Sequence, residues 1–244
     1  MTLKVFKDKT ELSRYIASFL IDHVNRKPES NLGLATGSTF TKVYRMLTEA
    51  YIRSQVSFRN VQTFNLDEYV DIDENHPETY RNFMNRHLFD YTDIDKTRTH
   101  FPPTDADIDY TEYDDLIARK GGIDIQLLGI GVNGHIGFNE PGVPFDTRTH
   151  KVRLAETTRQ ANKKFFDTLH EVPTHAVTMG IESIMASKRI ILAAYGKHKA
   201  DAVKDMVEGP ITEDHPASIL QKHKDCLIVL DEAAASKLKI SNDY

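Results

Sequence analysis

Short apolar segments alternate along this chain with longer segments of helical period, and this alternation constrains the fold more than any other feature of the sequence. Six of the short segments are predicted strands: residues 3–6, 32–36, 61–66, 123–131, 189–195 and 226–231. Several of them are apolar at successive positions, which is typical of strands that are covered on both faces of a parallel sheet.

Amphipathic helices are predicted between these strands, because apolar residues recur there every three or four positions. Their apolar faces contain Leu12, Ile16, Phe19 and Leu20 in one helix, Val43, Met46, Leu47, Ala50 and Tyr51 in a second, and Ala200, Val203 and Val207 in a third. The third should stop at Gly209-Pro210, where glycine can adopt a left-handed cap and proline cannot continue the helix. This order predicts an α/β fold with a doubly wound, mostly parallel, Rossmann-like sheet, helices on both faces, and ligands beyond the carboxyl ends of the strands.

The organisation into domains follows from length and from the absence of linkers. The 244 residues fall between one and two domains of about 150 residues each. The sequence contains no internal repeat, low-complexity tract or Gly/Ser-rich linker, and its long polar stretch, residues 91–112, is interpreted as a surface excursion. We therefore expect a single domain over residues 1–244.

The composition excludes several functional classes. The 31 basic and 36 acidic residues give a net charge of −5 and form no Lys/Arg block, so nucleic acid is not an expected partner. The longest apolar run, residues 190–195, is far shorter than the ~18 residues that a membrane span requires. The first ten residues lack a secretory signal, which makes the cytoplasm the expected location. The lone cysteine, Cys226, lies in an apolar strand and is expected to be buried.

The first candidate site is TGST, residues Thr36, Gly37, Ser38 and Thr39, between a predicted strand and a predicted helix. Glycine, small hydroxyl groups and free N–H groups at a helix N-terminus favour an anion such as phosphate. The alternative is that Ser38 or Thr39 only caps the helix, and the segment alone does not separate the two interpretations. It is not a Walker A loop, because no Gly-Lys-Ser/Thr follows.

The second candidate site is NLDEY, in which Asp67 and Glu68 follow the strand at residues 61–66. Either carboxylate can face a cleft as a general base. Acidic turn chemistry at a strand end is the simpler explanation when the pair is taken alone.

The third candidate site is the glycine-rich segment 129–142, which contains Asn133, His135 and Glu140. Its first six residues match G-x-G-x-x-G, but the later glycines and Pro141 forbid the helix that a dinucleotide-binding turn requires. A histidine close to a carboxylate can instead transfer protons near neutral pH. The alternative is a histidine that is merely hydrogen-bonded in a loop.

Two cationic residues, Arg159 and Lys199, complete the candidates, although a solvated charge on a helix is the simpler explanation of each when it is taken alone. The eleven histidines show no HExxH or comparable ligand spacing. We therefore expect no metal site.

Eight motifs occur in order over nearly the whole chain: LGLATGST, TFNLDEY, HPETYRNFM, LLGIGVNGHIGFNEPG, TRQAN, VTMGI, GKHKADAV and IVLDEAA. In these motifs the chain resembles the glucosamine-6-phosphate deaminase family. The resemblance implies hydrolytic conversion of the phosphosugar glucosamine 6-phosphate to fructose 6-phosphate and ammonia, in amino-sugar catabolism, without a metal or an organic cofactor.

The resemblance also implies catalytic roles. Asp67 would move the proton between C2 and C1, and His135 would open the sugar ring with help from Glu140 and Asn133. Many family members carry aspartate at the position of Asn133. Because an amide cannot offset imidazolium charge, Glu140 is expected to carry more of that role here, and Asn133 to position the ring.

For the substrate phosphate, the resemblance implies binding on residues 36–39, with Arg159 and Lys199 neutralising its charge. This agrees with the independent interpretation of TGST as an anion loop. The chain ends soon after its last predicted strand, and His150 and Val152 stand where regulated hexameric members are basic. A monomer without an effector site is therefore expected.

Two other functions remain open at the level of sequence. A 6-phosphogluconolactonase would share the fold and the phosphosugar site but does not need Asp67 as a carbon-acid base, so release of ammonia separates the two enzymes. A non-catalytic sugar-phosphate sensor would keep the anion loop but usually carries a DNA-binding domain, and no room for one is expected before Leu3.

Overall fold

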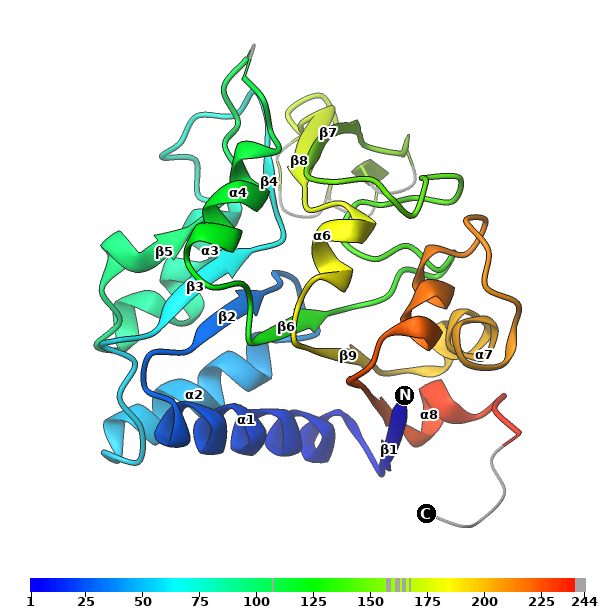
Figure 1. The fold of residues 1–244 in the computed structure, drawn as a ribbon, viewed down its shortest axis with the longest axis horizontal. Coiled ribbons are helices and arrows are strands. Elements are labelled where there is room, and N and C mark those ends of the chain that lie inside the picture. Colours follow the sequence, from blue (N-terminus) through cyan, green and yellow to red (C-terminus); the bar gives the residue numbers. More distant parts are fainter. Residues whose placement is uncertain (107, 157–158, 161–162, 164–165, 167, 240–244) are drawn as a thin grey trace.

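The main sheet has seven strands in the order β1-β10-β9-β6-β2-β3-β5, and every neighbouring pair is parallel (Figure 1). The strands are β1 (Thr2–Phe6), β10 (Cys226–Asp231), β9 (Arg189–Ala194), β6 (Ile125–Leu128), β2 (Asn31–Leu34), β3 (Gln62–Asn65) and β5 (Thr99–His100). The computed structural model describes residues 1–106, 108–156, 159–160, 163, 166 and 168–239. The predicted mostly parallel sheet is confirmed.

Helices cover both sides of this sheet, as predicted, with α1 and α2 below it and α4 and α6 above it in Figure 1. The α-helices are α1 (Lys9–Arg26), α2 (Thr41–Ile52), α3 (Tyr80–His87), α4 (Glu112–Arg119), α6 (Ile181–Met185), α7 (Ala200–Glu208) and α8 (Glu232–Ala235). The 3-10 helices that lie wholly within the described residues are η1 (Phe89–Tyr91), η2 (Lys96–Arg98), η4 (Lys197–Lys199) and η5 (Pro216–Lys222). Among the described residues, no helix is both long enough and apolar enough to cross a membrane.

The hydrophobic core lies between the sheet and these helices. All six residues of β10 are buried, and α1 buries Leu12, Ile16 and Leu20 on the face that the periodicity predicted. Each such side chain contributes about 1.5–3 kcal/mol when it is fully removed from water. Cys226 is 2% exposed, and burial raises the pKa of its thiol to about 12, so the prediction of a buried cysteine is confirmed.

Several predicted boundaries are wrong by one to three residues, at both ends of the strands. The strand predicted over residues 123–131 ends at Leu128, because the following glycines leave the sheet. The helix α7 stops before Gly209 as expected, but Gly209 is extended (φ −78°) rather than left-handed. The polar stretch 91–112 is not only a surface excursion, since it contains β5, the edge strand of the sheet.

A second, antiparallel sheet of three strands was not predicted. It is formed by β4 (Asp67–Tyr69), β8 (His175–Thr178) and β7 (His150–Arg153) in the order β4-β8-β7. Asp67 pairs with Thr178, and His150 pairs with the same residue from the other side. The strand predicted over residues 61–66 stops at Asn65. Asp67 follows it, as predicted, but is the first residue of a strand in this small sheet.

Candidate active site

The site is built at the point where the direction of winding of the main sheet reverses. The strands β2 and β6 are neighbours, and the chain proceeds from β2 toward β3 and β5 but from β6 toward β9 and β10. TGST follows β2, and the segment 129–142 follows β6. A Cβ atom placed on Gly129 would lie 4.0 Å from Thr39 Oγ1, so the two segments meet at the edge where ligands bind in such sheets.

Residues Thr36 to Thr39 form a turn before α2, in which Gly37 and Ser38 are exposed and Thr36 and Thr39 are half-buried. Gly37 has a left-handed backbone (φ 94°), a conformation that residues with a side chain rarely adopt. The helix begins at Thr41 after Phe40, and no side chain caps it, so the alternative interpretation of Ser38 or Thr39 as the cap is wrong. The hydroxyl groups of this turn are therefore not used to cap α2.

Cationic and phenolic groups surround the turn from other strand ends. Lys199, after β9, donates from Nζ to the Ile130 carbonyl oxygen at 2.7 Å, and Lys9, after β1, donates to the Ser38 carbonyl oxygen at 2.7 Å. The Tyr195 hydroxyl lies 3.3 Å from Ser38 Oγ, and the Lys9 ammonium lies 4.0 Å from the centre of the Tyr195 ring.

Lys9 and Tyr195 were not predicted as members of the site. Burial raises the pKa of Tyr195, but the Ser38 hydroxyl and the ammonium groups of Lys9 and Lys199 outweigh burial, and the net shift is downward. Burial lowers the pKa of Lys199. Tyr195 is the last residue of the predicted strand 189–195, so its position at a carboxyl end was the signal that could have identified it.

Asn133, His135 and Glu140 form one hydrogen-bonded cluster in the loop after β6. Asn133 Nδ2 donates to Glu140 Oε2 at 2.6 Å, Asn133 Oδ1 lies 2.7 Å from His135 Nδ1, and Glu140 Oε2 lies 3.6 Å from the same nitrogen. A carboxylate accepts but does not donate, so the Asn133 NH₂ group must face Glu140 and its oxygen must face His135. Nδ1 of His135 then carries a proton, which leaves Nε2 as the basic nitrogen.

The glycines of this loop allow close packing around that cluster. A Cβ atom on Gly131 would lie 2.2 Å from His135 Cε1. Gly137 is left-handed (φ 57°), and a Cβ atom there would lie 2.9 Å from Thr178 Oγ1 and 3.9 Å from Asp67 Oδ2. No helix begins within residues 135–142, so the G-x-G-x-x-G match is not a dinucleotide-binding turn, as predicted.

Asp67 is brought beside this loop by the small sheet. Its residue is 7% exposed, and burial, together with the neighbouring Glu68 charge, raises the pKa of its carboxyl group from 3.8 to about 8. A carboxyl group in this state is a stronger base than an exposed one once it loses its proton. The structure therefore places a buried carboxyl group beside Gly137, in the loop that also holds the histidine cluster.

Glu68 has a different environment from that of Asp67. Its carboxylate accepts backbone N–H bonds from Tyr69, Tyr80 and Arg81, each at 2.9 Å. Tyr80 and Arg81 are the first residues of α3, so Glu68 satisfies free donors at that helix N-terminus. Burial raises the pKa of Glu68, and these three N–H groups oppose the shift. The acidic pair thus divides into one residue that is held by a helix and one that faces the loop.

Arg159 has other partners in this structure. Its guanidinium donates to the carbonyl oxygens of Leu169 (3.0 Å) and Val172 (3.2 Å) and pairs with Glu156 (3.2 Å). None of these described contacts involves the turn at residues 36–39, so a role in phosphate binding stays a prediction. Of the TRQAN motif, only Arg159 and Gln160 lie within the described residues.

These features define a class: an α/β protein in which a turn rich in hydroxyl groups and a hydrogen-bonded histidine cluster meet at the switch point of a parallel sheet. Residues 8–229 match the model of the family described as glucosamine-6-phosphate isomerases/6-phosphogluconolactonase, and the chain belongs to that family.

Relatives and solved structures agree with this assignment. The chain is 45% identical over 238 residues to the glucosamine-6-phosphate deaminase of Mycoplasma mycoides subsp. mycoides, covering 98% of each protein. It is 46% identical over 239 residues to that of Bacillus pumilus, covering 97% of this chain and 99% of the relative. A solved monomeric glucosamine-6-phosphate deaminase is 44% identical with a TM-score of 0.93, covering 98% of this chain and 100% of that one. The resemblance inferred from the motifs is confirmed.

A more distant solved structure shares the fold alone. The 6-phosphogluconolactonase of Trypanosoma brucei has a TM-score of 0.76 at 19% identity, with coverage of 97% of this chain and 98% of that one. Both activities in the family description therefore occur on closely similar sheets, and the choice between them depends on the chemistry of the site.

Proposed function

We propose that the protein is a glucosamine-6-phosphate deaminase, which converts glucosamine 6-phosphate and water to fructose 6-phosphate and ammonia in amino-sugar catabolism. The observation that carries this proposal is the buried Asp67 carboxyl group beside the loop that holds His135. Hydrolysis of a lactone breaks no C–H bond and therefore needs no carbon-acid base. The names of the relatives at 45% and 46% identity support the same choice.

The substrate phosphate binds on residues 36–39, where the turn offers hydroxyl and N–H donors. The Lys199 ammonium, anchored on the carbonyl oxygen of Ile130, neutralises part of its charge. Arg159 completes this neutralisation when its guanidinium leaves its carbonyl partners in the 169–172 segment. Phosphate binding holds the sugar with its reacting carbons over the adjacent strand ends.

Ring opening requires a proton to leave the C1 hydroxyl and a proton to reach the ring oxygen. His135 carries out this transfer through Nε2, because Nδ1 is held by Asn133. Glu140 accepts a hydrogen bond from the Asn133 amide and lies 3.6 Å from His135 Nδ1, so it keeps the amide oxygen turned toward that nitrogen.

Deamination requires a second proton transfer, from C2 to C1 of the open-chain sugar. Asp67, as a carboxylate, takes the proton from C2 while the C1 carbonyl oxygen gains a proton from solvent, which gives an enolamine. Asp67 then returns its proton to C1, which leaves an iminium group at C2. Water adds to C2, and ammonia departs, giving the ketone of fructose 6-phosphate. Burial of Asp67 favours this step, because a carboxylate that is poorly solvated binds a carbon-bound proton more strongly.

The proposal also covers the setting of the enzyme: one domain over residues 1–244, a monomer, in the cytoplasm, with no metal or organic cofactor. A solved relative that is described as monomeric supports the oligomeric state. A core cluster that includes residues of α1, β2, β6, β9 and β10 supports the single domain.

An ammonia assay on the purified protein tests the function. Glucosamine 6-phosphate should release ammonia, whereas unphosphorylated glucosamine should release far less, and Asp67→Asn should abolish the reaction. Hydrolysis of 6-phosphogluconolactone without release of ammonia from the amino sugar would instead assign the lactonase activity.

A further inference from the structure

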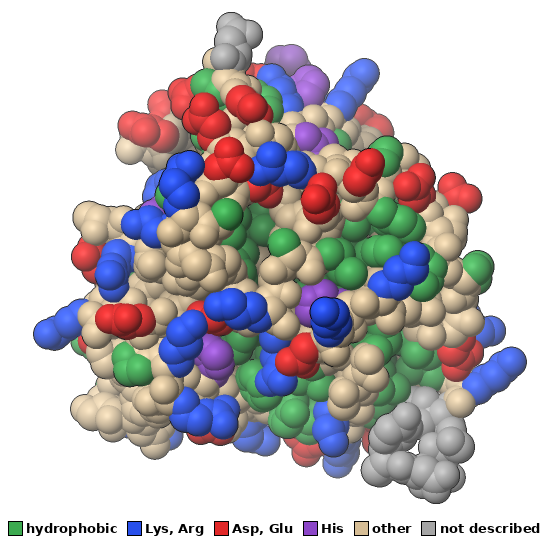
Figure 2. Space-filling view, viewed as in Figure 1, with side chains coloured by type: hydrophobic (Ala, Val, Ile, Leu, Met, Phe, Trp, Pro, Cys, Tyr) green, Lys and Arg blue, Asp and Glu red, His purple; other side chains and the backbone are tan. Residues whose placement is uncertain are grey.

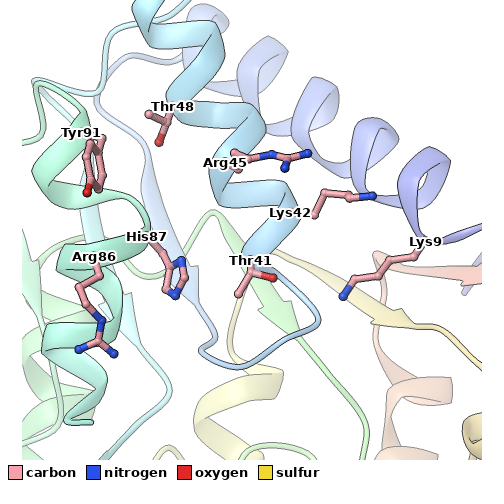
Figure 3. A pocket seen from close by; sticks show the side chains of 8 residues that line it. All are labelled: Lys9, Thr41, Lys42, Arg45, Thr48, Arg86, His87 and Tyr91. Carbon is pink, nitrogen blue, oxygen red and sulfur yellow. The ribbon is translucent and has the colours of Figure 1, made fainter. Parts of the chain in front are cut away.

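A cavity of about 700 Å³ lies over the exposed face of α2, and the proposed deamination does not use it. We call it the basic groove. It is lined from α1, α2 and the end of α3 by side chains that include Lys9, Thr41, Lys42, Arg45, Arg86 and His87. Figure 3 shows Lys9 and Lys42 on one side of a row formed by Thr41, Arg45 and Thr48, with Arg86 and His87 on the other side. A cavity of this volume can hold a small metabolite.

The lining of the basic groove is positively charged, although the whole chain carries a net charge of −5. Basic and acidic side chains are interspersed over the molecular face in Figure 2, whereas the lining residues of the groove include four Lys or Arg and no Asp or Glu. The flexible cations can therefore turn toward an anion in the groove.

The nearest acidic groups do not neutralise this charge. A carboxylate oxygen of Glu49 lies 3.5 Å from a guanidinium nitrogen of Arg45, and one of Glu78 lies 3.4 Å from a guanidinium nitrogen of Arg86. Both arginine side chains are exposed to solvent. Ion pairs of such length and exposure contribute little and are readily exchanged for a stronger anion. Asp8 accepts two backbone N–H bonds at the start of α1, and its charge also acts on Lys42. One positive charge remains after Glu49, Glu78 and Asp8 are counted.

The donor types and their spacing identify the ligand class. Guanidinium groups bind phosphate oxygens in a bidentate manner, and ammonium and hydroxyl groups add single contacts. The row from Thr41 to Thr48 rises about 10 Å along α2, with cations on both sides of it. Two linked phosphate groups offer oxygens to the cations on both sides of this row. We infer that the basic groove binds a diphosphate, either inorganic pyrophosphate or the diphosphate of a nucleotide.

The basic groove is linked to the anion loop through one peptide group. The Ser38 carbonyl oxygen accepts hydrogen bonds from Lys9 Nζ (2.7 Å) and from Thr41 Oγ1 (3.2 Å), and both donors line the groove. A diphosphate in the groove attracts the Lys9 ammonium and weakens its hold on Ser38. This consequence rests on the proposed function, because Ser38 belongs to the loop that binds the substrate phosphate.

Isothermal titration of the full-length protein with inorganic pyrophosphate tests the binding. Arg45→Gln combined with Arg86→Gln removes two groove cations, and binding should weaken by about tenfold or more. The matched control is Arg14→Gln with Arg53→Gln, which removes the same charge from exposed positions of α1 and the end of α2 outside the groove. Lys199→Gln disables the substrate phosphate site and should leave groove binding intact.

Three outcomes overturn the inference. Loss of pyrophosphate binding in Lys199→Gln, with retention in the Arg45/Arg86 variant, would place the anion in the substrate site alone. If pyrophosphate binding weakens equally in the Arg14/Arg53 control, the loss is due to the overall charge of the protein and not to the groove. Absence of binding to the wild-type protein would remove the site. ADP in the same titrations distinguishes the sources: tighter binding than pyrophosphate assigns a nucleotide, and equal binding assigns the inorganic anion.

Steady-state kinetics test the link to the loop. Saturating pyrophosphate should raise the KM for glucosamine 6-phosphate by about fivefold, and this rise should disappear in the Arg45/Arg86 variant while its basal activity is kept. An unchanged KM would overturn the coupling through Lys9. If the protein releases no ammonia at all, the proposed function fails, and the calorimetric result still decides the groove.

Discussion

Asp67→Asn should make the folded protein more stable at neutral pH while it removes the proposed base. Burial, with the Glu68 charge, raises the pKa of the Asp67 carboxyl group from 3.8 to about 8 in the folded state. The unfolded chain ionises near the ordinary value. Between these two values the unfolded state binds fewer protons than the folded state, so a rise in pH favours unfolding.

The magnitude follows from the interval between the two pKa values. Each pH unit inside the interval costs about 1.4 kcal/mol of the free energy of unfolding. Between pH 3.8 and pH 7 the Asp67 carboxyl group therefore lowers the free energy of unfolding by about 4 kcal/mol. Over the full interval, up to about pH 8, it lowers this free energy by about 6 kcal/mol. Asparagine has nearly the same shape and does not ionise, so Asp67→Asn removes this cost.

Urea unfolding of the wild type and of Asp67→Asn over a series of pH values measures the effect. The difference in the free energy of unfolding should be small near the ordinary carboxyl pKa, should grow as pH rises, and should level off above about pH 8. Any change in packing or hydrogen bonding that the amide introduces adds a constant, so the slope with pH carries the information.

Asp124→Asn is a matched control with the opposite sign. Burial raises the pKa of Asp124, but the Asn31 N–H group and the ammonium groups of Lys27 and Lys188 outweigh it, and the pKa is lowered. Its stabilising effect is present above the unfolded pKa and is lost as pH falls through the folded value. Asp124→Asn should therefore destabilise the protein near neutral pH, and this loss should shrink in acid. A difference for Asp67→Asn that is the same at every pH would refute the assigned environment.

Four further outcomes are expected. Asp67→Asn should abolish exchange of the substrate C2 proton with deuterated solvent. Glu68→Gln should retain this exchange but unfold at lower temperature, because Glu68 accepts hydrogen bonds from the start of α3. The reverse pattern would assign the role of base to Glu68. In the wild type, kcat/KM should rise with pH through about 8, and a profile flat in this range would exclude Asp67 as the base. His135→Gln should lower kcat by about 10²–10⁴-fold with substrate binding preserved, and wild-type turnover would contradict its role. Lys199→Gln should raise KM more than it lowers kcat, and a collapse of kcat at unchanged KM would argue against phosphate binding.

The main sheet could be predicted from sequence because its strands are buried on both faces. Residues 189–194 and 226–231 are apolar almost throughout, and no other environment in a chain of this composition explains such runs. The positions of the turn at residues 36–39 and of the histidine cluster were predictable for the same reason, since both follow such strands directly.

The small sheet could not be predicted, because β4, β8 and β7 have three or four residues each and mix polar with apolar positions.

The different environments of Asp67 and Glu68 could not be predicted from the sequence either. The difference depends on the N-terminus of α3, which is twelve residues further along the chain and reaches Glu68 only in the folded structure. Lys9 was missed because β1 is an edge strand and its end carries no glycine-rich motif.

The pairing of β1 with β10 has a consequence for biosynthesis. In the described part of the chain, β1 (Thr2–Phe6) pairs only with β10 (Cys226–Asp231). The same strand, β10, also pairs with the edge of β9. A nascent chain thus carries an unpaired β1 and an uncovered β9 until translation has passed residue 231. Closing so long a loop costs little more free energy than closing a short one, but it is slow. Chains that stop before Cys226 expose two strand edges and are expected to aggregate or to be bound by chaperones.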